Sequence, residues 1–133
     1  AVKFQSANLG SLNFQKGFTK DNKLTGYILR VDSRGYSSVI QILVGLDDKY
    51  TVAGMKIISQ AETPGLGTRI AEPWFIKQFM GKATNTLAVK KDGGEIDAIT
   101  GATISSRAVA TGVRQQIELF KTELEKTKLT KKK

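Results

Sequence analysis

The stretch 104-ISSRAVATGVRQQIELFKTEL-124 decides the fold class, because its apolar residues repeat with a helical period. From residue 109 onward they recur at intervals of four, four, three and four: Val109, Val113, Ile117, Phe120 and Leu124. Residues three and four apart share one face of a helix. The pattern therefore predicts an amphipathic helix of about five turns that begins at Ile104 and packs one face on a sheet.

Segments rich in β-branched and apolar residues precede this helix. Two of them, 23–31 and 38–46, flank the turn-like sequence 32–35 and predict an antiparallel hairpin. Residues 50–58 alternate in character and predict a further strand. An earlier strand around 14–18 pairs with the hairpin in this interpretation. The first dozen residues favour no single structure.

The sequence changes character at Glu62-Thr63-Pro64-Gly65-Leu66-Gly67. Pro64 fixes its own φ and Gly65 accepts a positive φ, which together predict a type II turn. Gly67 adds another position at which the backbone is free of a side chain.

A short helix is predicted over 72–79, with Pro73 in its first turn and Gly81 just past its end. Residues 86–90 and 95–99 predict two short strands. Strands followed by helices on one side predict an α+β fold, in which an antiparallel sheet carries a long C-terminal helix and a short helix packed on it.

At 133 residues the chain is expected to form one domain over 1–133, with a basic, frayed tail over 125–133. The net charge is +9, and six lysines lie among the last 13 residues. A solvated tail is the favoured interpretation, and weak attraction to anionic lipid or an acidic partner is the alternative. Nucleic-acid binding is disfavoured because aromatic residues do not interleave with the basic ones.

Cysteine and histidine are both absent, which excludes several kinds of chemistry. Disulfides, thiolate nucleophiles, haem ligation by histidine, histidine-based zinc sites and a Ser/His/Asp mechanism all require one of these residues. No metal site is expected. No apolar run approaches the ~20 residues that a membrane-spanning helix needs.

Hydroxyl side chains and a glycine cluster at the start of the long helix, in Thr100-Gly101-Ala102-Thr103-Ile104-Ser105-Ser106. A helix start has unpaired N–H groups and the positive end of the helix dipole, so it favours an anion such as phosphate. The simpler alternative is that Thr103 or Ser105 only caps the first turn. The residues alone leave both interpretations open.

Asp97-x-x-Thr100-Gly101-Ala102-Thr103 resembles the flavin-attachment motif of the FMN-binding domain family. The segment 62–67 resembles the second motif of the family, in the branch of the RnfG subunits of Rnf complexes, which is related to the NqrC subunits. Trp74, Phe79, Gly81 and Lys82 follow at spacings typical of that branch, and the similarity runs from about Gly26 to Val113. Two motifs in the right order make coincidence improbable.

This sequence departs from the family pattern at three positions. Thr100 stands where many members have serine, and Gln60 and Ala61 occupy positions where relatives often have histidine. None of these departures touches the acceptor threonine.

The resemblance implies that a flavin transferase uses FAD to esterify FMN to Thr103, so that Thr103 is modified and is not a catalyst. By position, Asp97 belongs to the sequence that the transferase recognises, with a solvated carboxylate as the alternative. The remaining positions implied to contact the cofactor are Glu62, Thr63, Gly65, Leu66, Gly67, Trp74, Thr100, Gly101, Ala102 and Ser105.

Individual roles within this set are also implied by the resemblance. Thr63 and Leu66 touch the ring, and Gly65 and Gly67 let the loop approach it, whereas ordinary core packing is the alternative for Leu66. Glu62 orients the loop by accepting backbone N–H bonds. Trp74 is either a neighbour of the flavin or a core residue, and the core role is favoured.

The function implied is that of an electron-carrier subunit with covalent FMN in a membrane-bound, Rnf-type ion-translocating oxidoreductase complex, without independent catalysis. Its partners would be the other membrane subunits and the transferase. The chain starts at Ala1 without an initiator methionine, and an anchoring helix before it is expected, with the domain on the extracytoplasmic side of the inner membrane. A flavinylated regulatory or sensory domain, and a basic lipid- or nucleic-acid-binding module without cofactor, remain alternatives.

Overall fold

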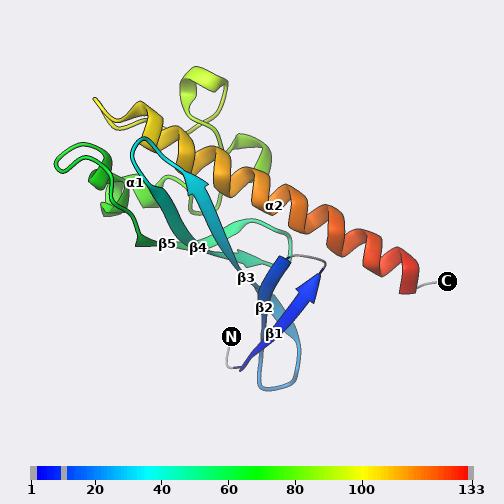
Figure 1. Cartoon of the computed structure of the whole chain (residues 1–133). Helices are drawn as coiled ribbons and strands as arrows, with labels where there is room; N and C mark the ends of the chain where they lie inside the picture. Colours follow the sequence, from blue (N-terminus) through cyan, green and yellow to red (C-terminus); the bar gives the residue numbers. More distant parts are fainter. Residues whose placement is uncertain (1–2, 10–11, 132–133) are drawn as a thin grey trace.

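The computed structural model describes residues 3–9 and 12–131 of the chain. Five strands come first, followed by short helical segments and one long helix (Figure 1). The strands are β1 (Lys3–Leu9), β2 (Leu12–Phe18), β3 (Leu24–Arg34), β4 (Val39–Asp47) and β5 (Val52–Ser59). The helices are η1 (Gly67–Ala71), α1 (Pro73–Lys77), η2 (Thr84–Thr86), η3 (Lys90–Asp92) and α2 (Thr103–Lys131), where η denotes a 3₁₀ helix.

The sheet is an antiparallel meander in the order β1-β2-β3-β4-β5, and α2 lies across one of its faces (Figure 1). This arrangement confirms the predicted α+β fold. In β4 the alternate residues Ile40, Ile42, Val44 and Leu46 are buried, because successive side chains of a strand point to opposite faces. The core therefore lies between this face of the sheet and α2.

The predicted apolar face of α2 is confirmed, since Val109, Val113, Ile117, Phe120 and Leu124 are all buried. The Phe120 ring lies edge-on to two aromatic rings of the sheet, with centroids 4.7 Å from Phe14 and 4.9 Å from Tyr27. Ile104 does not share this face and is 51% exposed. The helix is also longer than predicted and continues to Lys131.

The hairpin of β3 and β4 is longer than the sequence indicates. Asp32, Ser33 and Arg34 pair with the start of β4 and do not form the turn. The turn lies at 35–38, closed by a 2.8 Å hydrogen bond from the Gly35 N–H to the Ser38 carbonyl. Polar residues continue the strand here because their outward side chains remain in solvent. The first residues, for which the sequence favours no structure, form β1 from Lys3.

The prediction of strands over 86–90 and 95–99 is wrong. These residues contain η2 and a single isolated bridge between Val89 and Ile96. The chain folds tightly on itself, so that a Cβ at Gly94 would lie 2.0 Å from the Ala88 carbonyl oxygen. Apolar residues here are buried by this local packing, and burial without a ladder carries the same apolar pattern as a short strand.

The short helix predicted over 72–79 is present as α1. Gly81, predicted to end it, has a φ of +73°. Within the predicted basic tail, 125–131 continue α2, and 132–133 lie outside the described residues. Among the described helices, none combines the length and apolar character needed to cross a membrane.

The strand β3 and the helix α2 meet at close range where Ser33 faces Gly112. The Ser33 hydroxyl donates a 2.7 Å hydrogen bond to the Ala108 carbonyl of α2. A Cβ at Gly112 would lie 2.7 Å from the Ser33 Cβ, which is closer than side chains pack. Gly112 therefore lets the helix approach the sheet at this point.

We expect Gly112→Ala to lower the free energy of unfolding by about 1–3 kcal/mol, because helix and strand must separate. This cost exceeds the gain of up to about 1 kcal/mol that alanine brings to a helix interior. Gly54→Ala is the matched control, since a Cβ there meets nothing within 4 Å. Urea unfolding measures both, and a Gly112→Ala variant as stable as the parent would contradict the close packing.

Candidate functional site

A pocket of about 500 Å³ opens at the start of α2. This volume lies within the range of small-molecule and cofactor sites, which is about 300–1,000 Å³. Three separate segments line it: the β3–β4 turn, the loop after β5 and the turn that leads into α2. Their lining residues are Tyr36, Thr63, Leu66, Gly67, Gly101, Ala102, Thr103, Ile104 and Ser105.

The loop after β5 forms the predicted type II turn. The Leu66 N–H donates to the Thr63 carbonyl at 3.1 Å, with Pro64 and Gly65 between them. Gly65 has a φ of +75°, as the third position of such a turn requires. The turn leaves the Leu66 side chain 42% exposed at the pocket, so the alternative of core packing for Leu66 is wrong.

The turn that leads into α2 is held by the fully buried Ser106. Its hydroxyl accepts a 2.9 Å hydrogen bond from the Ile99 N–H and donates one of 2.8 Å to the Ala102 carbonyl. Gly101, with a φ of +80°, makes the sharp change of direction between these two residues. Thr103, the first residue of α2, is thereby fixed at the pocket.

Thr103 has a hydroxyl group without a hydrogen-bond partner among the described residues. The N–H groups of Thr103, Ile104 and Ser105 likewise have no acceptor within that part of the chain. Neither Thr103 nor Ser105 caps the helix with its side chain, so the capping alternative is wrong. The pocket therefore contains a free hydroxyl beside the unpaired N–H groups at the positive end of α2.

Glu62 joins the three segments that line the pocket. Its Oε1 accepts hydrogen bonds from the Tyr36 N–H at 2.7 Å and from the Ser105 hydroxyl at 2.6 Å. Its Oε2 accepts from the Ser37 N–H and hydroxyl, each at 3.1 Å, and from the Ser38 hydroxyl at 2.5 Å. The residue is 4% exposed. It accepts backbone N–H bonds as predicted, but from the β3–β4 turn and not from its own loop.

Two glycines allow the three segments to approach this carboxylate. A Cβ at Gly67 would lie 2.6 Å from the Glu62 Cβ and 2.8 Å from the Ser105 hydroxyl. A Cβ at Gly35 would lie 2.4 Å from Glu62 Oε1. The sequence predicts that Gly67 permits an approach to the ring, and the structure adds that it permits the contact between loop and helix.

The hydrogen bonds to Glu62 keep it ionised in spite of burial. Burial alone raises the pKa of a carboxyl group, whereas donors to the charged form lower it. Here the donors prevail and lower the pKa of Glu62 from 4.5 to about 2. In decreasing order of effect they are the Ser105 and Ser38 hydroxyls and the N–H groups of Tyr36 and Ser37.

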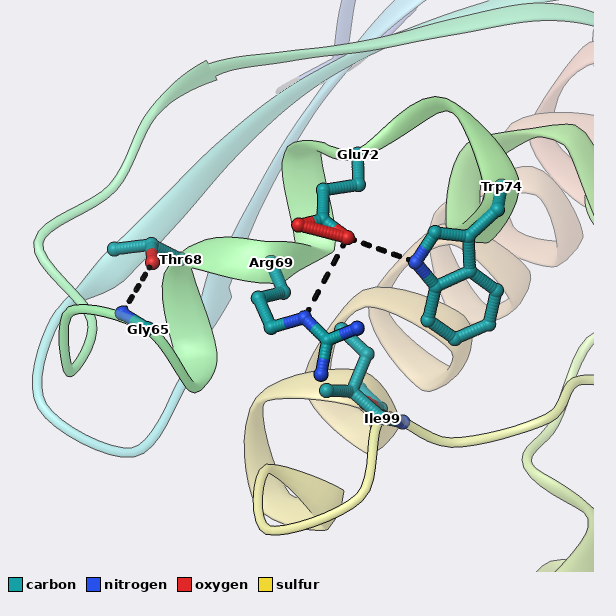
Figure 2. Close-up of polar contacts among 7 residues, drawn as sticks. Gly65, Thr68, Arg69, Glu72, Trp74 and Ile99 are labelled. Atoms are coloured by element: carbon teal, nitrogen blue, oxygen red, sulfur yellow. Dashed lines mark hydrogen bonds and ion pairs between the residues drawn. The ribbon is translucent and has the colours of Figure 1, made fainter.

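Four residues proposed from the sequence as cofactor contacts do not line the pocket: Glu62, Gly65, Thr100 and Trp74. Glu62 lies behind the lining, and Gly65 donates its N–H to the Thr68 hydroxyl at 3.1 Å (Figure 2). Thr100 is exposed in the turn before α2.

Trp74 lies beside the loop in a polar cluster (Figure 2). Its Nε1 donates to the Glu72 carboxylate at 2.9 Å, and the same oxygen contacts Arg69 at 3.4 Å. Trp74 is 42% exposed, so the favoured assignment to the core is wrong. An indole that donates to a surface carboxylate keeps its polar edge in solvent.

Asp97 lies at the surface in a fixed position. Its carboxylate pairs with Lys90 at 2.8 Å, and this hydrogen bond and charge hold the pKa of Lys90 above its ordinary value. The Gln78 amide bonds to both the N–H and the carbonyl of Asp97, at 2.7 and 3.0 Å. The side chain thus remains accessible while its backbone is anchored to the segment after α1.

Sequence reasoning missed two residues at the pocket, Tyr36 and Ile104. Tyr36 is 65% exposed, and both side chains line the pocket. An aromatic residue within a small polar turn, Gly35-Tyr36-Ser37-Ser38, has no strand partner to explain it, and that was the available signal. Ile104 precedes Val109 by five residues, an interval that breaks the period of the apolar helix face.

We expect Glu62→Gln to destabilise the domain by about 2–4 kcal/mol at about pH 7, because an amide presents donors to donors. The folded pKa lies below the unfolded one, so ionised Glu62 stabilises the fold above about pH 4.5. That contribution is lost as the pH falls through 4.5 toward 2, and the variant lacks it throughout. Urea unfolding of both proteins across this range measures the difference.

The control is Glu72→Gln, whose carboxylate is exposed and paired with Arg69, and whose expected effect is below about 1 kcal/mol. A gap between parent and Glu62→Gln that stays constant from neutral to acidic pH would contradict the role of the charge.

The fold resembles that of two crystal structures. NqrC from Shewanella oneidensis matches with a TM-score of 0.66 and 23% identity, over 80% of this chain and 55% of that one. The C-type component of the Na⁺-translocating NADH-quinone reductase from Parabacteroides distasonis matches with a TM-score of 0.65 and 27% identity, over 78% and 58%.

Relatives in sequence are G subunits of oxidoreductase complexes. The G subunit of the ion-translocating oxidoreductase complex of Methanosarcina acetivorans is 34% identical over 79% of this chain and 56% of that protein. Its namesake from Vibrio vulnificus is 43% identical over 68% and 46%. The G subunit of the proton-translocating ferredoxin:NAD⁺ oxidoreductase complex of Clostridium ljungdahlii is 39% identical over 74% and 55%. The chain spans about half the length of these relatives.

A family profile described as the FMN-binding domain matches residues 35–118. This range includes every residue that lines the pocket, from Tyr36 to Ser105, as well as Glu62 behind it. The match covers more than half of the chain, and the fold and the relatives agree with it. The chain belongs to the FMN-binding domain family.

Proposed function

We propose that this domain carries one FMN, esterified through its phosphate to the Thr103 hydroxyl, and transfers electrons as the G subunit of a membrane-bound, Rnf-type ion-translocating oxidoreductase complex. The observation that carries the proposal is the free Thr103 hydroxyl in a pocket at the start of α2, within a chain of the FMN-binding domain family. Bound FMN would supply the redox chemistry, and the protein would supply position and field.

The residues present fit this group. The nine lining residues are uncharged, and they offer apolar surface from Leu66, Ile104 and the Tyr36 ring to a flat heterocycle. Beside Thr103, the unpaired N–H groups at the positive end of α2 suit an ester phosphate. No basic side chain is needed to hold a phosphate that is covalently attached.

Attachment requires a flavin transferase and FAD. The Thr103 oxygen forms a bond to the FMN phosphorus, the bond between the two phosphates of FAD breaks, and AMP leaves while the hydroxyl proton passes to the leaving phosphate or to water. Asp97, accessible and anchored by Gln78, is the recognition residue in this proposal. Thr103 itself has no catalytic role.

Covalent attachment explains why an open pocket is sufficient. A cofactor bound only by contacts must offset a loss of translational and rotational freedom of about 4–15 kcal/mol. An ester removes that requirement, so the ring need not be enclosed. The exposed Tyr36, Leu66 and Ile104 then cover part of the ring and leave an edge open for exchange of electrons with a partner.

Membership of a complex rests on the names of the relatives, which are G subunits of ion- or proton-translocating oxidoreductases. We infer by analogy that the other subunits of such a complex are the partners of this domain. The chain matches only about half the length of those relatives. In this proposal an N-terminal helix anchors the domain to the inner membrane on the extracytoplasmic side.

Co-production with a flavin transferase is expected to add the mass of one FMN minus one water to the intact protein. Thr103→Ala should abolish this gain, because the acceptor oxygen is absent. Ser105→Ala is the matched control in the same helical turn, and it should retain the gain because its hydroxyl is already engaged by Glu62. Peptide mapping that places FMN on another residue would overturn the assignment.

The flavin fluorescence of the loaded domain is expected to increase in Tyr36→Leu, because a phenol ring in contact with the isoalloxazine quenches its excited state by electron transfer. Trp74→Leu is the control, since this exposed aromatic residue does not line the pocket. The comparison separates the two aromatic candidates. A larger increase in Trp74→Leu than in Tyr36→Leu would place the ring on the other side of the loop.

A further inference from the structure

The electrostatic surroundings of the pocket are one-sided. None of the nine lining residues carries a charge. Directly behind them lies the Glu62 carboxylate, which is in contact with two lining residues through the Tyr36 N–H and the Ser105 hydroxyl. The field inside the pocket therefore has a negative source at close range without a cation in the lining to oppose it.

This charge has a direct bearing on a redox cofactor. Two electrons and one proton convert an oxidised flavin ring into a reduced ring with one additional negative charge at neutral pH. A nearby negative charge raises the free energy of that form, and a low dielectric makes the interaction stronger than in water. A protein can therefore adjust a flavin potential through charges near the ring.

We infer that Glu62 is a positioning and tuning residue that lowers the midpoint potential of the flavin on Thr103 by maintaining a fixed negative charge behind the pocket. This inference rests on the proposed function and concerns its thermodynamics. Glu62 touches neither substrate nor cofactor in this scheme and acts through its field and through the segments it joins.

Two features make the charge a constant one. The carboxylate is buried and saturated by five hydrogen bonds from the β3–β4 turn and α2, so it has neither room nor need to move. Among these donors, Ser105 lies on the pocket side and offsets part of the field there. Removing the Ser105 hydroxyl should strengthen the field in the pocket, whereas neutralising Glu62 should weaken it.

The experiment uses the flavinylated protein, with loading verified by intact mass before any potential is measured. Reductive titration with dithionite and redox mediators, followed at the flavin absorption band, gives the midpoint potential. We expect Glu62→Gln to shift the potential upward and Ser105→Ala to shift it downward. Glu95→Gln, which neutralises an exposed carboxylate paired with Lys82, should leave it unchanged.

Glu62→Asp separates charge from geometry, since it shortens the side chain but keeps the charge. A potential that stays near the parent value in Glu62→Asp supports the field, and an upward shift as large as in Glu62→Gln overturns it. If Glu62→Gln does not fold, the opposite-sign shift of Ser105→Ala decides, and an unchanged or raised potential there overturns the inference. A parent protein that gains no FMN mass refutes the proposed function itself, which is a separate outcome.

Discussion

The architecture of the pocket depends on one buried carboxylate. Glu62 accepts hydrogen bonds from the turn between β3 and β4 and from the first turn of α2, while it belongs to the loop after β5. These three segments are distant in sequence, and each is short and irregular where it meets the pocket. An ionised group that is buried must have its acceptor positions satisfied, so the three segments are held in one arrangement.

The sheet and the long helix supply the rigid support for that arrangement. The apolar face of α2 is packed on the sheet through residues such as Val113 and Phe120, and Gly112 lets the helix lie close to β3. The first turn of the helix is different, since Ile104 faces the pocket and Thr103 keeps its hydroxyl unpaired. One helix thus provides both the anchor of the core and the polar end that meets a phosphate.

The chemistry offered by the pocket follows from what its lining lacks. Uncharged walls, a free hydroxyl and unpaired N–H groups suit a tethered neutral heterocycle with one phosphate better than a freely exchanging charged ligand. Exposed apolar side chains at Tyr36, Leu66 and Ile104 have no core to explain them and do have a flat ring to contact in the proposed function. The same openness suits transfer of electrons to another protein.

The sequence by itself determined the features that depend on local spacing, whereas only the tertiary structure decided which residues meet. The helical repeat from Val109 to Leu124, the strands of the meander and the type II turn at Gly65 follow from periodicity and backbone preference, and all are observed. The motif around Thr103 indicated the family that the comparisons bear out. The covalent link and the individual cofactor contacts remain predictions. The donors to Glu62 lie 24 to 43 residues away along the chain, so no local pattern reports their contact. The false strands at 86–90 and 95–99 have the same origin, because burial in a compact loop and burial in a ladder select the same apolar residues. Exposure and pocket contact are properties of packed segments, which spacing along one segment does not encode.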